Sequence, residues 1–224
     1  MSVVEQIVMA IASVERVEVL GYESDYDHNR SVVTFAGEPQ AVVQGAFEGI
    51  RTASYLIDME VQTGVHPRLG ATDVVPLIPI QNVTMEECVQ WAHHLGKRVA
   101  EELGIPVYLY EFAATRADRK NLEDVRRGEY EGLKASIATD ASRKPDYGEA
   151  IIGHSGATII GARHALIAYN VYLTTDDVSI AKRIARKIRF SSGGLPYVKA
   201  LGVLVNGKAQ VSMNLTNYKE TPIY

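Results

Sequence analysis

Residues 84–110, TMEECVQWAHHLGKRVAEELGIPVYLY, decide the fold of this chain, because they predict a long amphipathic helix that leads directly into a strand. Thr84 and Glu87 form a capping-box pattern at the start of the helix, and Gly104 followed by Pro106 ends it. Apolar side chains recur on one face at helical spacing: Cys88, Ala92, Leu95, Val99 and Leu103. The chain therefore contains at least one helix-to-strand unit.

Helices and strands alternate along the rest of the chain. Further helices are predicted over residues 3–13, from Pro39 through Ile57, and from Thr174 through Ile188. Asn206-Gly207 favours a type I′ turn between the last two strands. The strand-like runs are 16–22, 30–36, 72–80, 106–110, 165–173, 197–205 and 209–215. This pattern predicts an α+β fold, a layered, ferredoxin-like sandwich of mixed or antiparallel sheets packed against helices.

The division of the chain is predicted from a polar stretch that begins near Lys134. We expect a first subdomain over residues 1–140, a linker at 141–148, and a second subdomain over 149–224. Grooves between subdomains are common ligand sites, so the site is expected there.

Composition excludes several classes of function. The chain has 224 residues, a net charge of −4 and a pI of about 5.9, which gives no basic footprint for nucleic acid. No apolar run approaches a membrane span and the start does not resemble a signal peptide, so a cytoplasmic protein is expected. The lone cysteine, Cys88, is predicted to be a buried core residue.

Residues 63–80, TGVHPRLGATDVVPLIPI, predict a functional loop. Pro67 keeps His66 out of the helical region, and Gly64 and Gly70 permit backbone shapes that other residues resist. A histidine in such a loop can take and return a proton near neutral pH, although it can also simply hydrogen-bond to the backbone.

The run HPRLGATDVVP at residues 66–76 resembles the signature of glutamate formimidoyltransferases. Four further segments match in the same order: 27–35 (DHNRSVVTF), 106–110 (PVYLY), 127–133 (RGEYEGL) and 156–163 (GATIIGAR). The resemblance implies transfer of a formimino group from N-formimino-L-glutamate to tetrahydrofolate in histidine degradation. It also implies tetrahydrofolate as co-substrate, no metal, and a homodimer.

The resemblance assigns candidate roles to individual residues. His66 matches the family's catalytic histidine, which serves as general base and acid. Both substrates carry carboxylates, and an arginine fork can hold a carboxylate with two hydrogen bonds. Arg68 is the first choice, with an ordinary ion pair to a local acid as the alternative. The remaining substrate-binding candidates are Asn29, Arg30, Asp73, Arg127 and Arg163.

The segment 148–156 matches the position of the folate-binding stretch of the family, although it is one residue shorter. Its glycines would let the backbone approach a flat pterin, but taken by themselves they favour a plain turn. Tyr108 and Tyr110 share one face of a strand and could stack on a pterin or pack in the core. The folate-binding candidates are Gly148, Gly153, His154, Ser155 and Gly156.

Other charged and polar residues receive less specific interpretations. His28 could orient substrate or belong to a polar turn, and acidic residues at 23, 25 and 27 could lie beside the His66 loop. His93, His94 and the basic run 182–189 are expected on solvated helix faces, and His164 at the surface. No spacing of His, Asp or Glu suggests a metal site.

Three departures from the family pattern bear on activity. Val65 stands where the family has a glutamate. The family's first strand and loop are expected to be missing, and the second subdomain to be truncated. These departures leave two alternatives, a folate enzyme that acts on 5-formyltetrahydrofolate and a catalytically silent folate-binding remnant.

Overall fold

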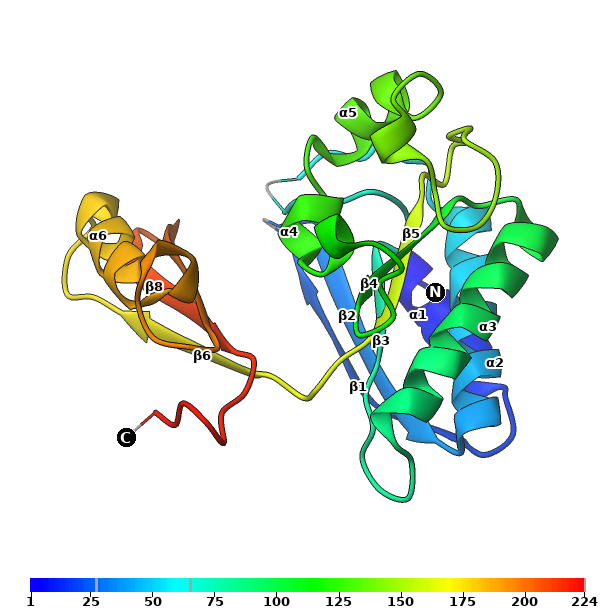
Figure 1. Ribbon diagram of the computed structural model, residues 1–224, viewed down its shortest axis with the longest axis horizontal. Coiled ribbons are helices and arrows are strands. Elements are labelled where there is room, and N and C mark those ends of the chain that lie inside the picture. The colour runs from blue at the N-terminus through cyan, green and yellow to red at the C-terminus, as the bar shows by residue number, and fades with distance from the viewer. Residues whose placement is uncertain (27, 65, 224) are drawn as a thin grey trace. The chain divides into compact units, whose positions relative to one another are not determined.

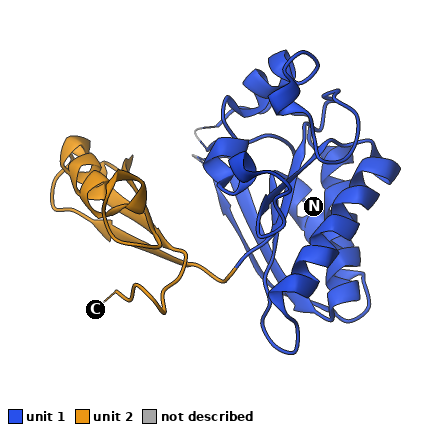
Figure 2. Ribbon diagram, in the orientation of Figure 1, with its two compact units in different colours: residues 1–163 blue, residues 164–224 orange. Residues whose placement is uncertain are grey.

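The computed structural model describes residues 1–26, 28–64 and 66–223, which form two compact units (Figures 1 and 2). Unit 1 is Met1–Arg163 and unit 2 is His164–Tyr224. Helices accompany both parallel and antiparallel sheets, which confirms the predicted α+β class.

The boundary between the units lies after Arg163, whereas the sequence analysis placed a linker at 141–148. The reason is strand β5 (Thr158–Ala162), which lies between β3 (Val74–Leu77) and β4 (Val107–Glu111) in one sheet. A central strand cannot leave its sheet without breaking two ladders of hydrogen bonds. Residues up to 163 therefore belong to unit 1.

The sheet β3-β5-β4 is parallel and buried on both faces. Tyr108 and Tyr110 are 3% and 2% exposed and pack in a core cluster with Ile159. Of the two predicted roles, stacking on a pterin or packing in the core, they have the second. Leu109 and Ile160 face a second core cluster. Sequence analysis missed β5 because a short apolar run without alternation, typical of such a strand, carries no periodic signal.

Helix α3 (Met85–Leu103) packs on one face of this sheet, α2 (Pro39–Leu56) lies beside α3, and α1 (Val3–Ala12) lies against α2 (Figure 1). These elements confirm the three helices predicted in this part of the chain. The capping box of α3 is also present, and Gly104 ends it in the left-handed region at φ 67°. Cys88 is 6% exposed in this core, as predicted.

The opposite face of the sheet is covered by short helices that the sequence did not predict. They are α4 (Leu122–Val125) and α5 (Glu129–Ser136), and they contribute Val125 and Leu133 to the core cluster around Tyr108. Short 3₁₀ turns, η1 (Ala117–Arg119) and η2 (Ala141–Arg143), flank them. Helices of one or two turns are too short to show periodicity.

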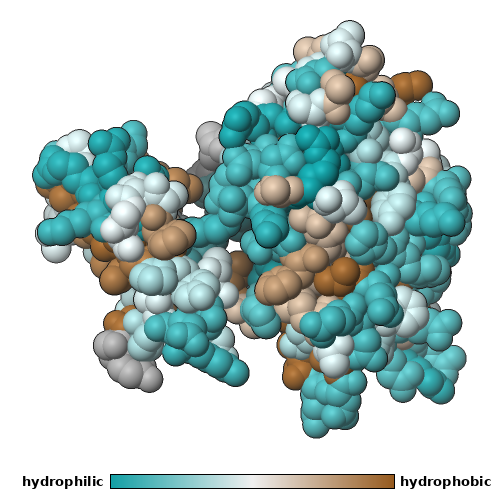
Figure 3. All heavy atoms as spheres, in the orientation of Figure 1, coloured by the Kyte–Doolittle hydropathy of each residue, from teal (hydrophilic) through white to brown (hydrophobic). Residues whose placement is uncertain are grey.

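Unit 1 also contains a twisted hairpin of β1 (Val17–Asp25) and β2 (Arg30–Gly37). Its strands are antiparallel, and Asp25 pairs with Arg30 at the tip. Much of the face of unit 1 shown in Figure 3 is hydrophilic. No helix in the described ranges is long and apolar enough to cross a membrane.

Unit 2 is an antiparallel sheet with one helix on its face. Strands β6 (Ile167–Tyr172), β7 (Val198–Val205) and β8 (Lys208–Leu215) pair in the order β6-β8-β7, and α6 (Val178–Ile188) packs on them. The predicted turn is confirmed, because Asn206 and Gly207 both have positive φ, 49° and 71°. An η3 turn (Phe190–Ser192) follows α6. Four basic residues of α6 are exposed, as expected of a solvated face: Lys182, Arg183, Arg186 and Lys187.

We predict that Gly156→Ala lowers the free energy of unfolding by about 2 kcal/mol or more. Gly156 has φ 74°, and an added Cβ would lie 2.3 Å from the carbonyl oxygen of Leu69. The substitution therefore combines backbone strain with a clash against rigid backbone. Urea denaturation monitored by circular dichroism measures the change.

Gly153→Ala is the matched control, because a Cβ at Gly153 would meet nothing within 4 Å. We expect it to change stability by less than about 0.5 kcal/mol. Equal destabilisation by the two substitutions would contradict the proposed importance of the close contact at Gly156.

Candidate active site

His66 lies in the loop between α2 and β3, and its imidazole is half-buried. Its Nε2 is 3.1 Å from Nη1 of Arg30. A guanidinium can only donate, so Nε2 accepts this hydrogen bond and the ring proton is on Nδ1. The contact therefore selects a neutral imidazole with one defined tautomer.

The surroundings of His66 lower its pKa from 6.5 to about 4. Burial is the largest cause, followed by the positive charges of Arg30 and Arg126 and by His28. A hydrogen bond with the backbone of Pro67 opposes the shift. His66 is therefore neutral at physiological pH, which is the form that can accept a proton.

The tip of the β1–β2 hairpin holds the loop that carries His66. Asn29, at φ 46°, donates from Nδ2 to the side-chain oxygen of Gln62 at 2.9 Å and to the carbonyl oxygen of Thr63 at 2.8 Å. The two backbones are so close that a Cβ on Gly64 would lie 2.8 Å from the carbonyl oxygen of His28. Asn29, predicted as a substrate ligand, here fixes the loop.

His28 lies beside His66, with ring centroids 6.3 Å apart and the rings edge to face. Its Nδ1 is 2.9 Å from a carboxylate oxygen of Asp25, and its backbone N–H donates to the other oxygen at 2.9 Å. The end of β1 thus brings an acidic residue near the loop, as the sequence suggested. Asp27, predicted to lie beside the loop, and Val65 are outside the described residues.

Helix α5 holds the loop from the other side. Arg68 pairs with Glu129 at 3.0 Å and with Glu131 at 2.7 Å, and it also donates to the carbonyl oxygen of Gln62 at 3.1 Å. Earlier in the loop, Glu60 accepts a hydrogen bond from Tyr130 at 2.7 Å and pairs with Lys134. Arg68, the first choice as a substrate ligand, is thus engaged by two protein carboxylates.

A second arginine that the sequence analysis did not select, Arg126, pairs with Asp73. The other oxygen of Asp73 accepts the backbone N–H of Leu69 at 2.9 Å, so this carboxylate closes the loop. Burial raises the pKa of Asp73, and the charge of Arg126 opposes the rise. Arg127 lies in the matching motif but pairs with Asp124 in solvent. The signal for Arg126 was its position next to that motif.

The segment predicted to bind folate lies against the same loop. Gly70 and Gly156 form an antiparallel bridge, and Ala71 donates to the carbonyl oxygen of Ser155 at 2.9 Å. A Cβ on Gly70 would lie 2.3 Å from the carbonyl oxygen of Ala157, so glycine is required for this approach. The loop and the segment therefore share a backbone contact within unit 1.

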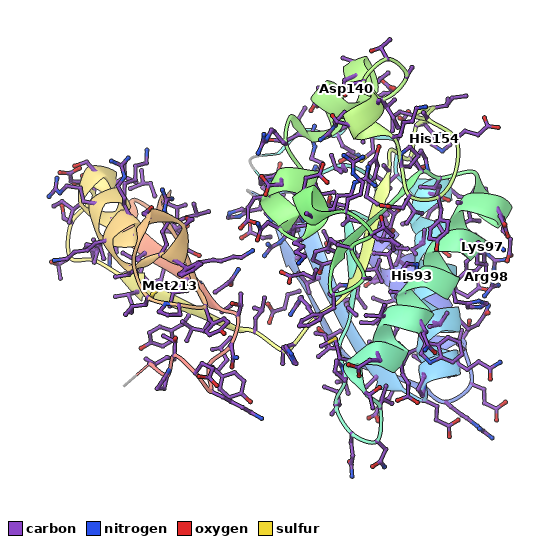
Figure 4. All side chains as sticks on the ribbon, viewed as in Figure 1. His93, Lys97, Arg98, Asp140, His154 and Met213 are labelled. Carbon is purple, nitrogen blue, oxygen red and sulfur yellow. The ribbon has the colours of Figure 1, made fainter. Side chains whose placement is uncertain are left out.

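The other folate candidates have structural contacts. His154 Nε2 is 2.8 Å from the carbonyl oxygen of Ser54, and its own carbonyl oxygen accepts from Met59 at 2.7 Å. Gly148 turns at φ 90° near Ile105, and Gly153 is exposed. Figure 4 shows His154 on the loop before β5 and His93 on α3. His93 is half-buried and bonds to Tyr147 at 2.8 Å, so its predicted exposure is wrong.

Two further features of unit 1 involve arginines. Arg163, at the end of β5, hydrogen-bonds to the side chain of Tyr110, whose pKa is raised by burial. A hollow of about 340 Å³ between α2 and α3 contains Arg16 and Arg98, which pair with Glu38 and Glu102. Within the described part of the chain, no cluster of three or more His, Cys, Asp or Glu could hold a metal ion.

We predict that His66 makes the protein lose stability in acid. The folded-state pKa of about 4 lies below the ordinary value of 6.5. As the pH falls from 6.5 to 4, the unfolded chain gains a proton that the folded chain resists, so the free energy of unfolding falls. His66→Gln removes this effect, and urea denaturation at several pH values measures it.

The stability of the parent relative to His66→Gln should decline through this pH window and level off below it. Above the window, pH should leave the difference constant. Parallel stability curves for the two proteins across the window would show that the pKa of His66 is ordinary.

Comparison with known proteins gives the family of the chain. The family model for the formiminotransferase domain, N-terminal subdomain, matches residues 1–163, and the family model for the formiminotransferase domain matches residues 168–224. Glutamate formimidoyltransferase of Thermoplasma acidophilum is 52% identical over 219 residues, which cover 96% of this chain and 72% of that protein. The enzyme of the same name from Streptococcus pyogenes serotype M1 is 43% identical, and the match covers 100% of this chain and 75% of that protein.

A formimidoyltransferase-cyclodeaminase of Dictyostelium discoideum is 42% identical, and the match covers all of this chain and 43% of that protein. The match to the N-terminal subdomain ends at the last residue of unit 1, and the second match lies within unit 2. The resemblance predicted from the ordered motifs is confirmed, and the chain belongs to the formiminotransferase family.

Proposed function

We propose that this protein transfers a formimino group from N-formimino-L-glutamate to tetrahydrofolate in histidine degradation. The observation that carries the proposal is His66, a half-buried neutral imidazole among positive charges on a loop fixed from two sides. The names of two relatives, glutamate formimidoyltransferase, support the same reaction.

The reaction needs one proton to move from one nitrogen to another. The folate nitrogen forms a bond to the formimino carbon, and the bond from that carbon to the glutamate nitrogen breaks. The folate nitrogen loses a proton and the glutamate nitrogen gains one, so the transfer needs no redox partner. We propose that Nε2 of His66 accepts the first proton and returns it to the leaving nitrogen.

Arginines are the proposed ligands of the substrate carboxylates. Arg68 is already held by Glu129 and Glu131, so we assign it to positioning of the loop. Arg30 is exposed and touches the reactive nitrogen of His66, which makes it the better candidate. Arg126 supplies further positive charge, although Asp73 neutralises part of it.

Folate is proposed to lie along the backbone of residues 153–156. This segment runs beside the His66 loop through the bridge of Gly70 and Gly156. Its exposed backbone at Gly153 would permit the close approach of a flat ring. We further propose that the protein acts as a homodimer in the cytoplasm, as the family resemblance implies.

We predict that His66→Gln lowers kcat by roughly 10²–10⁴-fold, because an amide cannot accept the proton. The affinity for tetrahydrofolate should change little, since glutamine keeps the size and polarity of the site. Initial rates of 5-formimino-tetrahydrofolate formation and calorimetric titration with the folate measure the two quantities.

His94→Gln is the control, because His94 is an exposed residue on α3. It should keep the rate of the parent. If His66→Gln kept more than about a third of the parent rate, the assignment of His66 as base would be abandoned. If the parent protein formed no product from N-formimino-L-glutamate and tetrahydrofolate, the proposed reaction itself would be rejected.

A further inference from the structure

The hydrogen bond between Arg30 and His66 blocks the reaction that we assign to His66. Nε2 of His66 accepts a proton through its lone pair, and that lone pair already accepts Nη1 of Arg30 at 3.1 Å. The guanidinium keeps its own protons at any physiological pH. While this hydrogen bond is made, the base is therefore capped by a neighbour that can neither take nor give the reacting proton.

We propose that Arg30 is a substrate-responsive cap, which leaves His66 when a carboxylate of N-formimino-L-glutamate binds to it. This inference rests on the proposed function and deepens it. The substrate then creates its own base, because one arginine both recognises the carboxylate and controls Nε2 of His66.

The exchange of partners is favoured by charge. A guanidinium that donates to a neutral imidazole makes one hydrogen bond to an uncharged acceptor, whereas a carboxylate offers two charged oxygens in matching geometry. Arg30 is an exposed side chain, so it can rotate without disturbing the core. Its backbone stays fixed, because it pairs with Asp25 at the start of β2.

The other basic side chains near His66 already have acidic neighbours. Arg126 pairs with Asp73, a carboxylate that also binds the backbone of Leu69. His28 lies 2.9 Å from Asp25. The contact described for the side chain of Arg30 is His66 itself. Among these groups Arg30 is the one placed to exchange its partner for a ligand.

Release of Arg30 also strengthens the base. Burial lowers the pKa of His66 most, and the positive charge of Arg30 is the next largest cause. When a carboxylate neutralises Arg30 and draws it away, the proton affinity of Nε2 increases. A base with a pKa nearer to the working pH transfers protons more efficiently. The free protein therefore holds a weak base, and the substrate complex a stronger one.

The test is a titration of His66 by ¹H–¹³C NMR, with its imidazole signal assigned by loss in His66→Gln. L-Glutamate serves as the probe, because it carries the carboxylates but has no group to transfer. Glutaramide, which has a similar chain without charge, serves as the uncharged control. In the parent protein, saturating L-glutamate should raise the pKa of His66 by about one unit or more, and glutaramide should not.

Arg30→Met should raise the pKa of His66 by about one unit or more without any ligand, and L-glutamate should then add little. Arg51→Met is the matched control, since Arg51 is a partly exposed arginine on α2 paired with Glu48, and it should behave as the parent. Arg30→Lys keeps the charge but loses the fork, so it should keep the low pKa and respond less to L-glutamate.

An unchanged pKa of His66 in Arg30→Met, or an equal response to L-glutamate in the parent and in Arg30→Met, would overturn the cap. These readouts need no turnover, so they separate the inference from the proposed reaction. Absence of product with a normal L-glutamate response would reject the reaction and not the cap. Product formation without any response of His66 would reject the cap alone.

Discussion

The close approach of Gly70 to Gly156 is the contact on which the architecture of unit 1 depends. It brings two backbones to a separation that no Cβ would permit, and Ala157 donates there to the carbonyl oxygen of Leu69 at 3.0 Å. One side of the contact continues into the central strand of the sheet, and the other carries His66. The loop is therefore an extension of the sheet, and backbone contacts with the segment before β5 set its shape.

The arginines around the loop differ in whether they are paired with a carboxylate. Arg68 is bound by two glutamates of α5 and Arg126 by one aspartate, so both act first as parts of the scaffold. Arg30 instead meets an imidazole nitrogen. Residues of one chemical type thus acquire different roles from their neighbours. Burial and nearby positive charge both lower the pKa of the half-buried His66, so both favour its neutral form.

Much of the fold could be predicted from the sequence because its signals are local. Caps and a 3.6-residue period defined α3, and a dipeptide defined the turn at Asn206-Gly207. The strand β5 and the helix α5 were missed because such short segments carry no periodic signal. The boundary after Arg163 was missed because it depends on the pairing of β5 with strands that are distant in the chain. The motif predicted His66 and Arg68 as site residues. The acidic partners of Arg68 lie 61 and 63 residues away in the chain, so its ion pairs could not be predicted from the sequence.

The order of strands in unit 1 also sets the order in which it can fold. Strands β3 and β4 are made first, yet they do not pair with each other, because β5 must enter between them. Until the ribosome has released Ala162, both strands present unpaired edges, which are templates for pairing with other chains. Non-local parallel pairing is also slow. Growing chains of this protein thus pass through a vulnerable interval that closes only when the last strand of the unit is inserted at its centre.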